Sequence, residues 1–329
     1  MRVQIIRCTT AIALACAVSA PAQAQDAKAA EILAQTRKAL GGKKLDALKA
    51  VSIDADMARN VNNMQMASKV EMHVEMPDKY VRIEEPRAGM AMVLNNGFNG
   101  DKAILPGGGA MSMQGGAMVF RMGPGGPVAE GAKPTPEQQA EMNKAALRSQ
   151  KMEISRLMLG WFGMAHPALP VQYTYVGEAE SPDGKAHVIE AKDPDGFSAR
   201  VFIDQNNYLP LMVSYQGRAP RVMTSGGPMV THAAGATAGQ TVTRSARELS
   251  DEERKKLAAD AEKQIAQTMQ ASPMVDISIF FDDWRDVDGV QFPHVMRRAS
   301  AGTTNEEWTI SRVRINPKID AKKFAADTK

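Results

Sequence analysis

The sequence predicts an α+β protein that is mainly antiparallel β, with a few helices packed against the sheet. Apolar and polar residues alternate with a period of two in many short segments, as they do in half-buried strands. Turn signals in which Asp or Asn precedes Gly separate several of these segments and favour tight hairpins. Only three other segments carry the start or stop signals of helices.

The N-terminal segment, residues 1–24, is typical of a cleavable bacterial secretory signal peptide. Arg2 and Arg7 precede an apolar run that is too short to span a bilayer and that ends at the small-residue site Ala22-Gln23-Ala24. Cleavage after this site leaves residues 25–329, which we expect to form a single β domain. The signal predicts a periplasmic protein.

Both cysteines of the chain, Cys8 and Cys16, fall inside this signal. The mature protein therefore has no thiol, no disulfide and no thiolate ligand for zinc or an iron–sulfur cluster. An outer-membrane lipoprotein would need Cys16 as its mature N-terminus, but Leu14 lies one position away from the usual pattern. Stability must come from a hydrophobic core.

The mature chain is nearly neutral. Loss of Arg2 and Arg7 lowers the count of Lys and Arg from 40 to 38 against 37 Asp and Glu, which gives a net charge of +1. Such a balance provides no electrostatic footprint for nucleic acid, so we expect no nucleic acid partner. No stretch after residue 24 is apolar over the length that a transmembrane segment needs.

A helix and two alternating strands are predicted first. Residues 26–42 favour a helix that is capped by Asp26 and ends at Gly41-Gly42. The segments "VSIDADMA" (51–58) and "KVEMHVEM" (69–76) alternate apolar with polar side chains. We therefore expect one face of each strand in the core and the other face in solvent.

The remaining strands follow the same pattern. Segments rich in β-branched and aromatic residues are separated by turn sequences such as "SPDGK", "DPDG" and "DQNN". A meander of hairpins in one antiparallel sheet is the expected arrangement. The predicted strands are residues 80–85, 91–96, 171–180, 186–192, 197–204, 209–217, 275–285, 290–299 and 306–316.

Two insertions interrupt the strands. Residues 104–134 are expected to form a Gly/Met-rich loop, because their glycines and prolines cannot sustain a helix or a central strand. Thr135 then supplies the N-cap, and Gln138 completes the capping box, of a helix that reaches about Gly160. Residues 218–273 combine a linker with a charged helix.

The segment "DDWRDVDGVQFPH" (282–294) contains four aspartates and could be a calcium loop or a turn. A calcium loop of the EF-hand kind with Gly289 at its sixth position would place Trp284 first and Val295 last. Neither side chain supplies the oxygen ligand that those positions need. A tight hairpin turn over 286–289 accounts for these residues instead.

Taken together, these segments resemble periplasmic proteins of the LolA-like outer-membrane lipoprotein-sorting superfamily. The resemblance rests on the helix ending "ALGG", on "ARVFIDQNNYLPLMV" and on the final "WRDVDGVQFPHVM" and "EEWTISRVRINPKIDAKKF". It covers about residues 28–100, 170–217 and 275–325. It implies a curved, incomplete β-barrel with a few helices packed against it and an apolar cavity that holds acyl chains. The two insertions depart from that compact fold.

The resemblance implies a non-enzymatic periplasmic binding or carrier protein for a lipid, a lipoprotein acyl chain or another hydrophobic ligand. Burying an acyl chain is favourable by roughly 0.8 kcal/mol per methylene. No cofactor and no metal site is expected. Alternation does not distinguish a filled interior from one that a ligand lines. The ligand-binding candidates are the residues predicted to face inward: Val51, Ile53, Met57, Val70, Met72, Val74, Met76, Ile83, Tyr173, Tyr175, Val201, Ile203, Ile277, Ile279 and Phe281.

Two alternative functions stay open. The soft thioethers of three Met-x-Met pairs could bind Cu(I), although flexible methionines also suit an adaptable cavity and no histidine lies beside the pairs. A protein-interaction module of the cell envelope that uses residues 218–273 is the second alternative. The five histidines lack metalloprotease spacing, and no hydrolase or nucleotide motif is present. The methionine pairs are Met64-Gln65-Met66, Met90-Ala91-Met92 and Met111-Ser112-Met113.

Overall fold

A computed structural model describes most of the chain, and its main element is a twelve-stranded antiparallel sheet. The described residues are 22–61, 64–87, 93–105, 112–113, 116–117, 121–123, 126–128, 135–181, 184–218 and 273–325. The strands of the large sheet are β1 Ala50–Val61, β2 Met64–Glu75, β3 Lys79–Pro86, β4 Leu94–Asn99, β5 Lys102–Ile104, β10 Gln172–Ser181, β11 Gly184–Lys192, β12 Ser198–Asp204, β13 Pro210–Arg218, β14 Met274–Val287, β15 Val290–Ser300 and β16 Thr303–Ile315.

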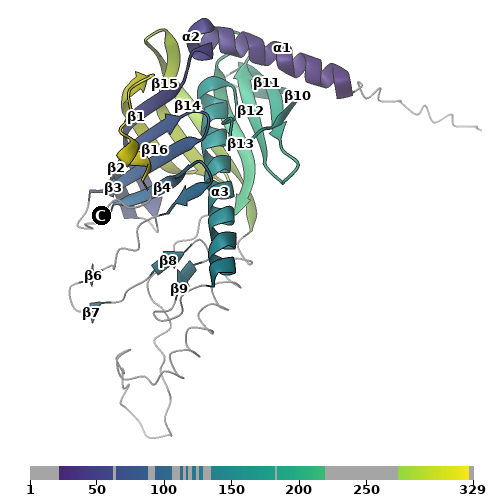
Figure 1. Ribbon diagram of the computed structural model, residues 1–329. Helices are drawn as coiled ribbons and strands as arrows, with labels where there is room; N and C mark the ends of the chain where they lie inside the picture. The colour runs from purple at the N-terminus through teal and green to yellow at the C-terminus, as the bar shows by residue number, and fades with distance from the viewer. Residues whose placement is uncertain are drawn as a thin grey trace, which may run out of the picture.

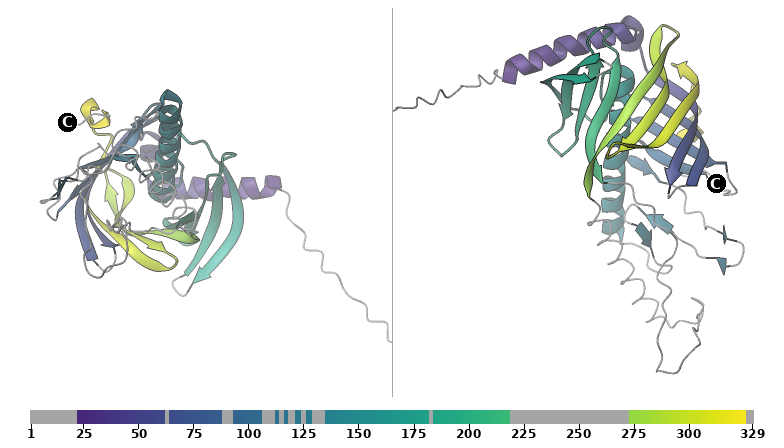
Figure 2. Two further views of the ribbon diagram at one scale, coloured as in Figure 1. Left: turned by 90° about the horizontal axis from the view of Figure 1, so that it is seen from below. Right: turned by 180° about the vertical axis from the view of Figure 1, so that it is seen from behind.

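The large sheet is open and strongly curved (Figure 1). Its order runs from β10 through β14, β15 and β16 to β1 and on to β5, so the first and last strands pair in its middle and β10 and β5 are its edges. Helix α1 (Ala22–Leu40) crosses the upper end, and the sheet curls around helix α3 (Pro136–Phe162) (Figure 2). α3 contacts β12, β13 and β14 on one side and β4 and β5 on the other. The predicted curved, incomplete barrel with a few helices is confirmed.

The long helices use the capping signals of the sequence. α1 is followed by Gly41 and Gly42 at φ values of 142° and 52°, which residues with a side chain rarely adopt. The short helix α2 (Lys43–Asp46) comes directly after them. At the start of α3, the Thr135 hydroxyl accepts a hydrogen bond from the backbone N–H of Gln138, whose side chain bonds back to the Thr135 N–H.

Two predicted helix boundaries are wrong. α1 begins before Asp26, which therefore does not cap it; the Asp26 carboxylate instead accepts a hydrogen bond from the Thr174 hydroxyl at 3.0 Å. α3 ends at Phe162 rather than at about Gly160, because Gly163 adopts the left-handed φ of 63° and caps the helix, whereas Gly160 lies within the helix and packs against the ring of Phe281. A Cβ atom at position 160 would lie 1.9 Å from Phe281 Cζ, so this close approach requires glycine.

The main apolar cluster fills the space between the helices and the concave face of the sheet, which we call the inner face. It joins inner side chains of the strands with Leu40 of α1 and with Trp161 and Phe162 of α3. The Trp161 and Phe162 rings pack on Phe292 with centroid distances of 5.4 and 5.8 Å. Each such buried side chain contributes roughly 1.5–3 kcal/mol, so this cluster is the main source of stability.

The predicted turn between β14 and β15 is confirmed. Asp288 and Gly289 have φ values of 55° and 83°, the positive values that a tight hairpin turn needs. The Asp286 carboxylate accepts a hydrogen bond from the Gly289 N–H at 3.1 Å. Within the described part of the chain, no three His, Cys, Asp or Glu side chains gather as ligands of a metal ion.

The strands differ from the prediction in three places. β4 begins at Leu94 rather than at residue 91, and β5 was not predicted. Segment 104–134 was expected to be a loop, yet its described residues include two short two-stranded sheets. These are β6 (Ser112–Met113) with β7 (Gly116–Ala117), and β8 (Arg121–Gly123) with β9 (Gly126–Val128). The predicted signal peptide up to residue 21 and the charged helix within 219–272 lie outside the described residues.

His166 gives the fold a measurable pH dependence. Its side chain is fully buried, and burial, together with the charge of Lys151, lowers its pKa to about 4. The unfolded chain binds this proton near the ordinary histidine pKa of about 6.5. The free energy of unfolding is therefore highest above that pH and falls as the pH decreases toward 4. We expect urea unfolding to show a loss of about 2 kcal/mol between pH 7 and pH 5.

A His166→Asn variant is the control for this prediction. It does not titrate in this range, so its free energy of unfolding should change much less between the two pH values, whatever its absolute stability. A slope equal to that of the wild type would show that other groups cause the effect.

Candidate functional site

The predicted ligand-binding residues lie mostly on the inner face, where they form an apolar zone. Met76, Tyr173 and Tyr175 are partly buried against the main apolar cluster. The others in this zone are buried members of that cluster, contributed by β1, β2, β12 and β14: Val51, Ile53, Met57, Val70, Met72, Val74, Val201, Ile203, Ile277, Ile279 and Phe281.

Ile83 is the exception, and its predicted inward orientation is wrong. The inward residues of β3 are Tyr80, Arg82 and Glu84, whereas Ile83 packs on the outer face with Phe324 of the C-terminal segment. A hydropathy pattern assigns a strand's apolar residues to its buried face. It fails here because Glu84 is buried through an ion pair.

Helix α3 occupies the space in front of the apolar zone. Its Leu157, Trp161 and Phe162 side chains are at most 3% exposed. The Trp161 N–H contacts Met296 Sδ at 3.1 Å. A hollow beside Leu157, Ile279 and Met296 measures about 10 Å³, room for about one water molecule. The hollow at this place is therefore much smaller than an acyl chain.

A charged zone follows the apolar zone on the same inner face. Arg59 lies two positions after Met57 on β1, and Arg298 lies two positions after Met296 on β15, so each arginine is on the same face of its strand as the methionine. The three glutamate side chains of the zone are at most 23% exposed. The charged zone consists of Arg59, Arg82, Glu84, Glu153, Arg156, Arg298 and Glu306, contributed by β1, β3, α3, β15 and β16.

Ion pairs connect the charged zone across the sheet. Arg59 lies 2.9 Å from Glu306 and 3.7 Å from Glu84. Arg82 binds Glu84 at 2.9 Å. Arg298 of β15 pairs with Glu153 of α3, so the network also ties the helix to the sheet.

The arginines hold Glu306 in its charged form. Burial alone would raise the pKa of this carboxyl group. The guanidinium groups of Arg298, Arg82 and Arg59 outweigh burial and lower the pKa to about 2. The Trp308 N–H donates a further hydrogen bond to Glu306 at 2.6 Å, and Arg82 lies 4.6 Å from the centroid of the Trp308 ring.

Sequence reasoning missed the charged zone, although one signal was present. Glu306 shares its face of β16 with Trp308, so its position in the alternation is that of a buried residue. Arg82 and Glu84 likewise share a face with Tyr80. Charged residues at core positions of several strands indicate an internal polar cluster, but which of them meet depends on the pairing of β16 with β1.

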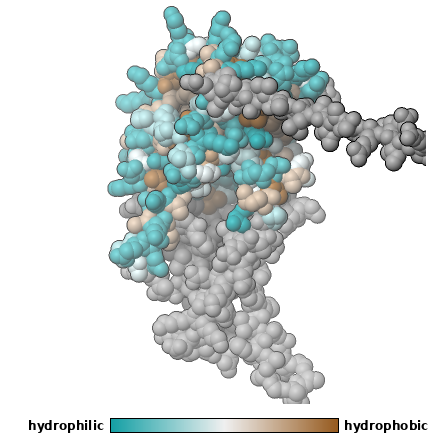
Figure 3. Space-filling model, turned by 90° about the vertical axis from the view of Figure 1, so that its right-hand side faces the viewer, coloured by the Kyte–Doolittle hydropathy of each residue, from teal (hydrophilic) through white to brown (hydrophobic). Residues whose placement is uncertain are grey.

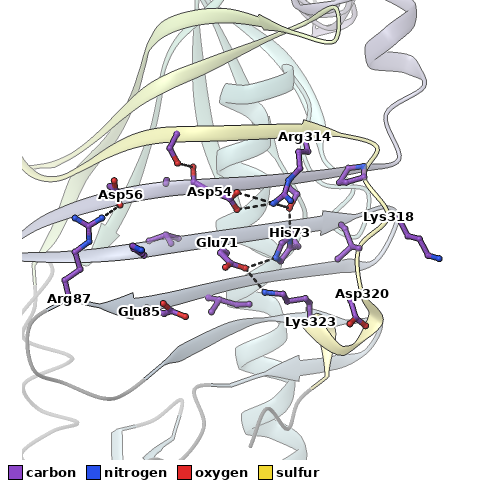
Figure 4. A pocket seen from close by; sticks show the side chains of 18 residues that line it. Asp54, Asp56, Glu71, His73, Glu85, Arg87, Arg314, Lys318, Asp320 and Lys323 are labelled. Carbon is purple, nitrogen blue, oxygen red and sulfur yellow. Dashed lines mark hydrogen bonds and ion pairs between the residues drawn. The ribbon is translucent and has the colours of Figure 1, made fainter.

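A larger hollow, of about 780 Å³, lies on the outer face (Figure 4). Its floor is formed by β1, β2, β3 and β16, and residues 317–320 and Lys323 line one side. Three ion pairs join side chains of its lining, and one of them connects Arg87 with Asp56. Arg314 binds Asp54 at 3.2 Å, and Lys323 binds Glu71 at 2.6 Å.

His73 links these ion pairs. Its Nδ1 lies 2.6 Å from Ser52 Oγ and its Nε2 lies 3.4 Å from Glu71, while Arg314 donates to Ser52 Oγ at 3.2 Å. Burial lowers the pKa of His73, which keeps the ring neutral near pH 7. A serine beside a neutral imidazole can act as a nucleophile, but Ser52 is only 3% exposed. The network instead connects the C-terminal segment, through Lys323, to the sheet.

On the side of the molecule that Figure 3 shows, the hydrophobic side chains of the described residues lie mainly in small patches. The exposed large ones are Val93, Val176, Leu211 and Met274, which come from separate strands and a loop. In the described ranges, no helix is long and apolar enough to cross a membrane.

The alternative sites fall largely outside the described residues. Of the methionine pairs, Met64-Gln65-Met66 lies at the start of β2, whereas Met90-Ala91-Met92 and Met111 are not described. The 218–273 insertion is described only at its two ends. Copper binding and protein interaction through these segments stay predictions.

Comparison with known proteins yields similar folds at low sequence identity. A LolA superfamily protein from Nitrosomonas europaea is 8% identical with a TM-score of 0.45, over 90% of this chain and 97% of that chain. A putative outer membrane lipoprotein-sorting protein domain from Vibrio parahaemolyticus is 12% identical with a TM-score of 0.42, over 91% and 97%. No model of a protein family and no curated protein matches the sequence. These likenesses concern the fold alone.

The ion pairs of the charged zone predict how loss of one carboxylate changes the free energy of unfolding. Glu306→Gln would leave Arg59 and Arg298 short of a counter-charge in a largely buried site, which should lower the free energy of unfolding by about 3 kcal/mol. Glu307→Gln is the matched control, because the neighbouring Glu307 is exposed, and it should change stability by less than about 0.5 kcal/mol. Equal effects of the two substitutions in urea unfolding would contradict the buried network.

Proposed function

We propose that this chain is a non-enzymatic binding protein that holds a lipid acyl chain or another hydrophobic ligand between α3 and the inner face of the sheet. The observation that carries the proposal is the apolar zone itself. It extends over β1, β2, β12 and β14, and the sheet around it is open, with α3 in front of it. A hydrophobic ligand needs such a surface, and the described part of the outer face offers only small apolar patches.

The energies of helix packing and ligand binding are comparable. Six large apolar side chains of α3 are buried and contribute roughly 1.5–3 kcal/mol each, about 9–18 kcal/mol together: Ile154, Leu157, Met158, Leu159, Trp161 and Phe162. An acyl chain of about twelve methylenes would gain roughly 10 kcal/mol on the same surface. A ligand can therefore offset much of the cost of shifting α3, and an empty protein closes its interior when α3 returns.

The compartment fits this function. The N-terminal segment has the pattern of a secretory signal, which would deliver the mature chain to the periplasm. Lipids that cross this aqueous space need a protein that shields their chains from water. An interior that is closed when empty would keep the apolar zone from aggregating with other proteins.

Binding of a fluorescent fatty acid to the delipidated mature protein tests the proposal. We expect saturable binding, and we expect Leu157→Ala to raise the affinity because it enlarges the hollow that Leu157 lines. The gain should be about fourfold for each methylene that the new space accepts.

Leu45→Ala is the control, since it removes the same atoms from a buried site in α2 that does not line the hollow. It should leave the affinity close to that of the wild type. The proposal fails if neither the wild type nor Leu157→Ala binds the probe.

A further inference from the structure

We propose that the ligand is an amphiphile with an anionic headgroup, and that the arginines of the charged zone bind this headgroup. The inference rests on the proposed function and names its class of ligand. The headgroup chemistry is that of a carboxylate or a phosphate, whose oxygens match the planar N–H donors of guanidinium groups.

The charged zone holds an excess of positive charge. Four arginines, Arg59, Arg82, Arg156 and Arg298, share three glutamates among the described residues. Their side chains are between 12% and 36% exposed. Because a charge withdrawn from water is costly unless it is paired, the zone favours one additional anionic group.

Arg156 is the arginine with the weakest ion pair. Its Nη1 lies 3.9 Å from Glu153, and Glu153 already binds Arg298. The Arg156 guanidinium instead packs on the ring of Tyr215, with 3.9 Å between its central carbon and the ring centroid. An anion beside Arg156 would supply the counter-charge that Glu153 provides only at a distance.

The zone also contains buried hydrogen-bond donors. Among the described residues, the Nε atoms of Arg82, Arg156 and Arg298 are buried and have no hydrogen-bond partner. Buried polar groups in native proteins are almost always hydrogen-bonded, so three such donors in one cluster need an explanation. The oxygens of a carboxylate or phosphate would accept hydrogen bonds from them.

The position of the zone suits a headgroup. The small hollow is lined by Leu157, Ile279 and Met296 of the interior and, at the same time, by Arg298 and Glu306 of the charged zone. A ligand whose chain follows the apolar zone would therefore end at the guanidinium groups. The larger outer hollow lacks this combination, because its lining carries five acidic and five basic side chains and so has no excess of positive charge.

Dodecanoate, dodecyl phosphate and dodecanol, which share one alkyl chain, test the inference by calorimetric titration of the delipidated mature protein. Both anions should bind at least about tenfold more tightly than dodecanol, and added salt should reduce this difference. Inorganic phosphate should bind far more weakly than dodecyl phosphate. If it binds equally well, the zone is a site for a free anion and the inference is wrong.

Arg156→Gln identifies the residue that carries the preference. It removes the excess charge, so the preference for the anions should fall to about twofold or less while dodecanol binding changes little. Arg148→Gln is the matched control on the same helix, because Arg148 pairs with Asp193 at 2.6 Å outside the charged zone. It should keep the wild-type preference.

The outcomes separate the two proposals. Equal affinity of the wild type for all three ligands would overturn the headgroup inference and leave the proposed function standing. Binding of none of them would overturn the proposed function as well. The wild-type comparison decides the inference even if Arg156→Gln does not fold, and an unchanged preference in a folded Arg156→Gln variant would contradict the assignment of the headgroup to Arg156.

Discussion

The packing of α3 against the inner face is the contact on which the rest of the structure depends. The large sheet does not close on itself, because β5 and β10 remain edges, so another element must cover its apolar inner face. α3 does this by contacting strands near both edges, and Gly160 lets it approach the Phe281 ring closely. The same contact fills the interior. Under the proposed function, stability and ligand binding would therefore compete for one surface, and the position of α3 would decide between them.

The charged zone is the second constraint. Buried ion pairs stabilise a fold little compared with apolar side chains of the same volume, so the stability of the sheet does not explain them. They divide the inner face into an apolar part and a part rich in arginine, which suits a ligand with two chemically different ends. The ion pairs of the outer face have a different role from those of the charged zone. There the pairs of Asp54 with Arg314 and of Glu71 with Lys323 are balanced, and they help to attach the C-terminal segment to the sheet.

Local features of the sequence predicted much of the fold. Alternation located the strands because every second side chain of β1 and β2 enters the core, and the capping box at Thr135 marked the start of α3. The errors came from contacts between distant residues. Gly160 looked like a helix end because its partner Phe281 is far away in the sequence, and Ile83 was placed inside because alternation alone does not reveal that Arg82 and Glu84 are buried as an ion pair. The charged zone assembles only through the pairing of β16 with β1 and the packing of α3, so no local pattern could have identified all its members.

Native mass spectrometry of the mature protein, purified without detergent from cells, tests the central claim most directly. If the inner face holds an amphiphile beneath α3, the spectrum will contain a population with an added mass of a few hundred daltons, and organic extraction will remove that mass. The extracted compound can then be identified, and its headgroup should be anionic. A protein that carries only the mass of its own chain, with nothing lipid-like in the extract, would contradict the account.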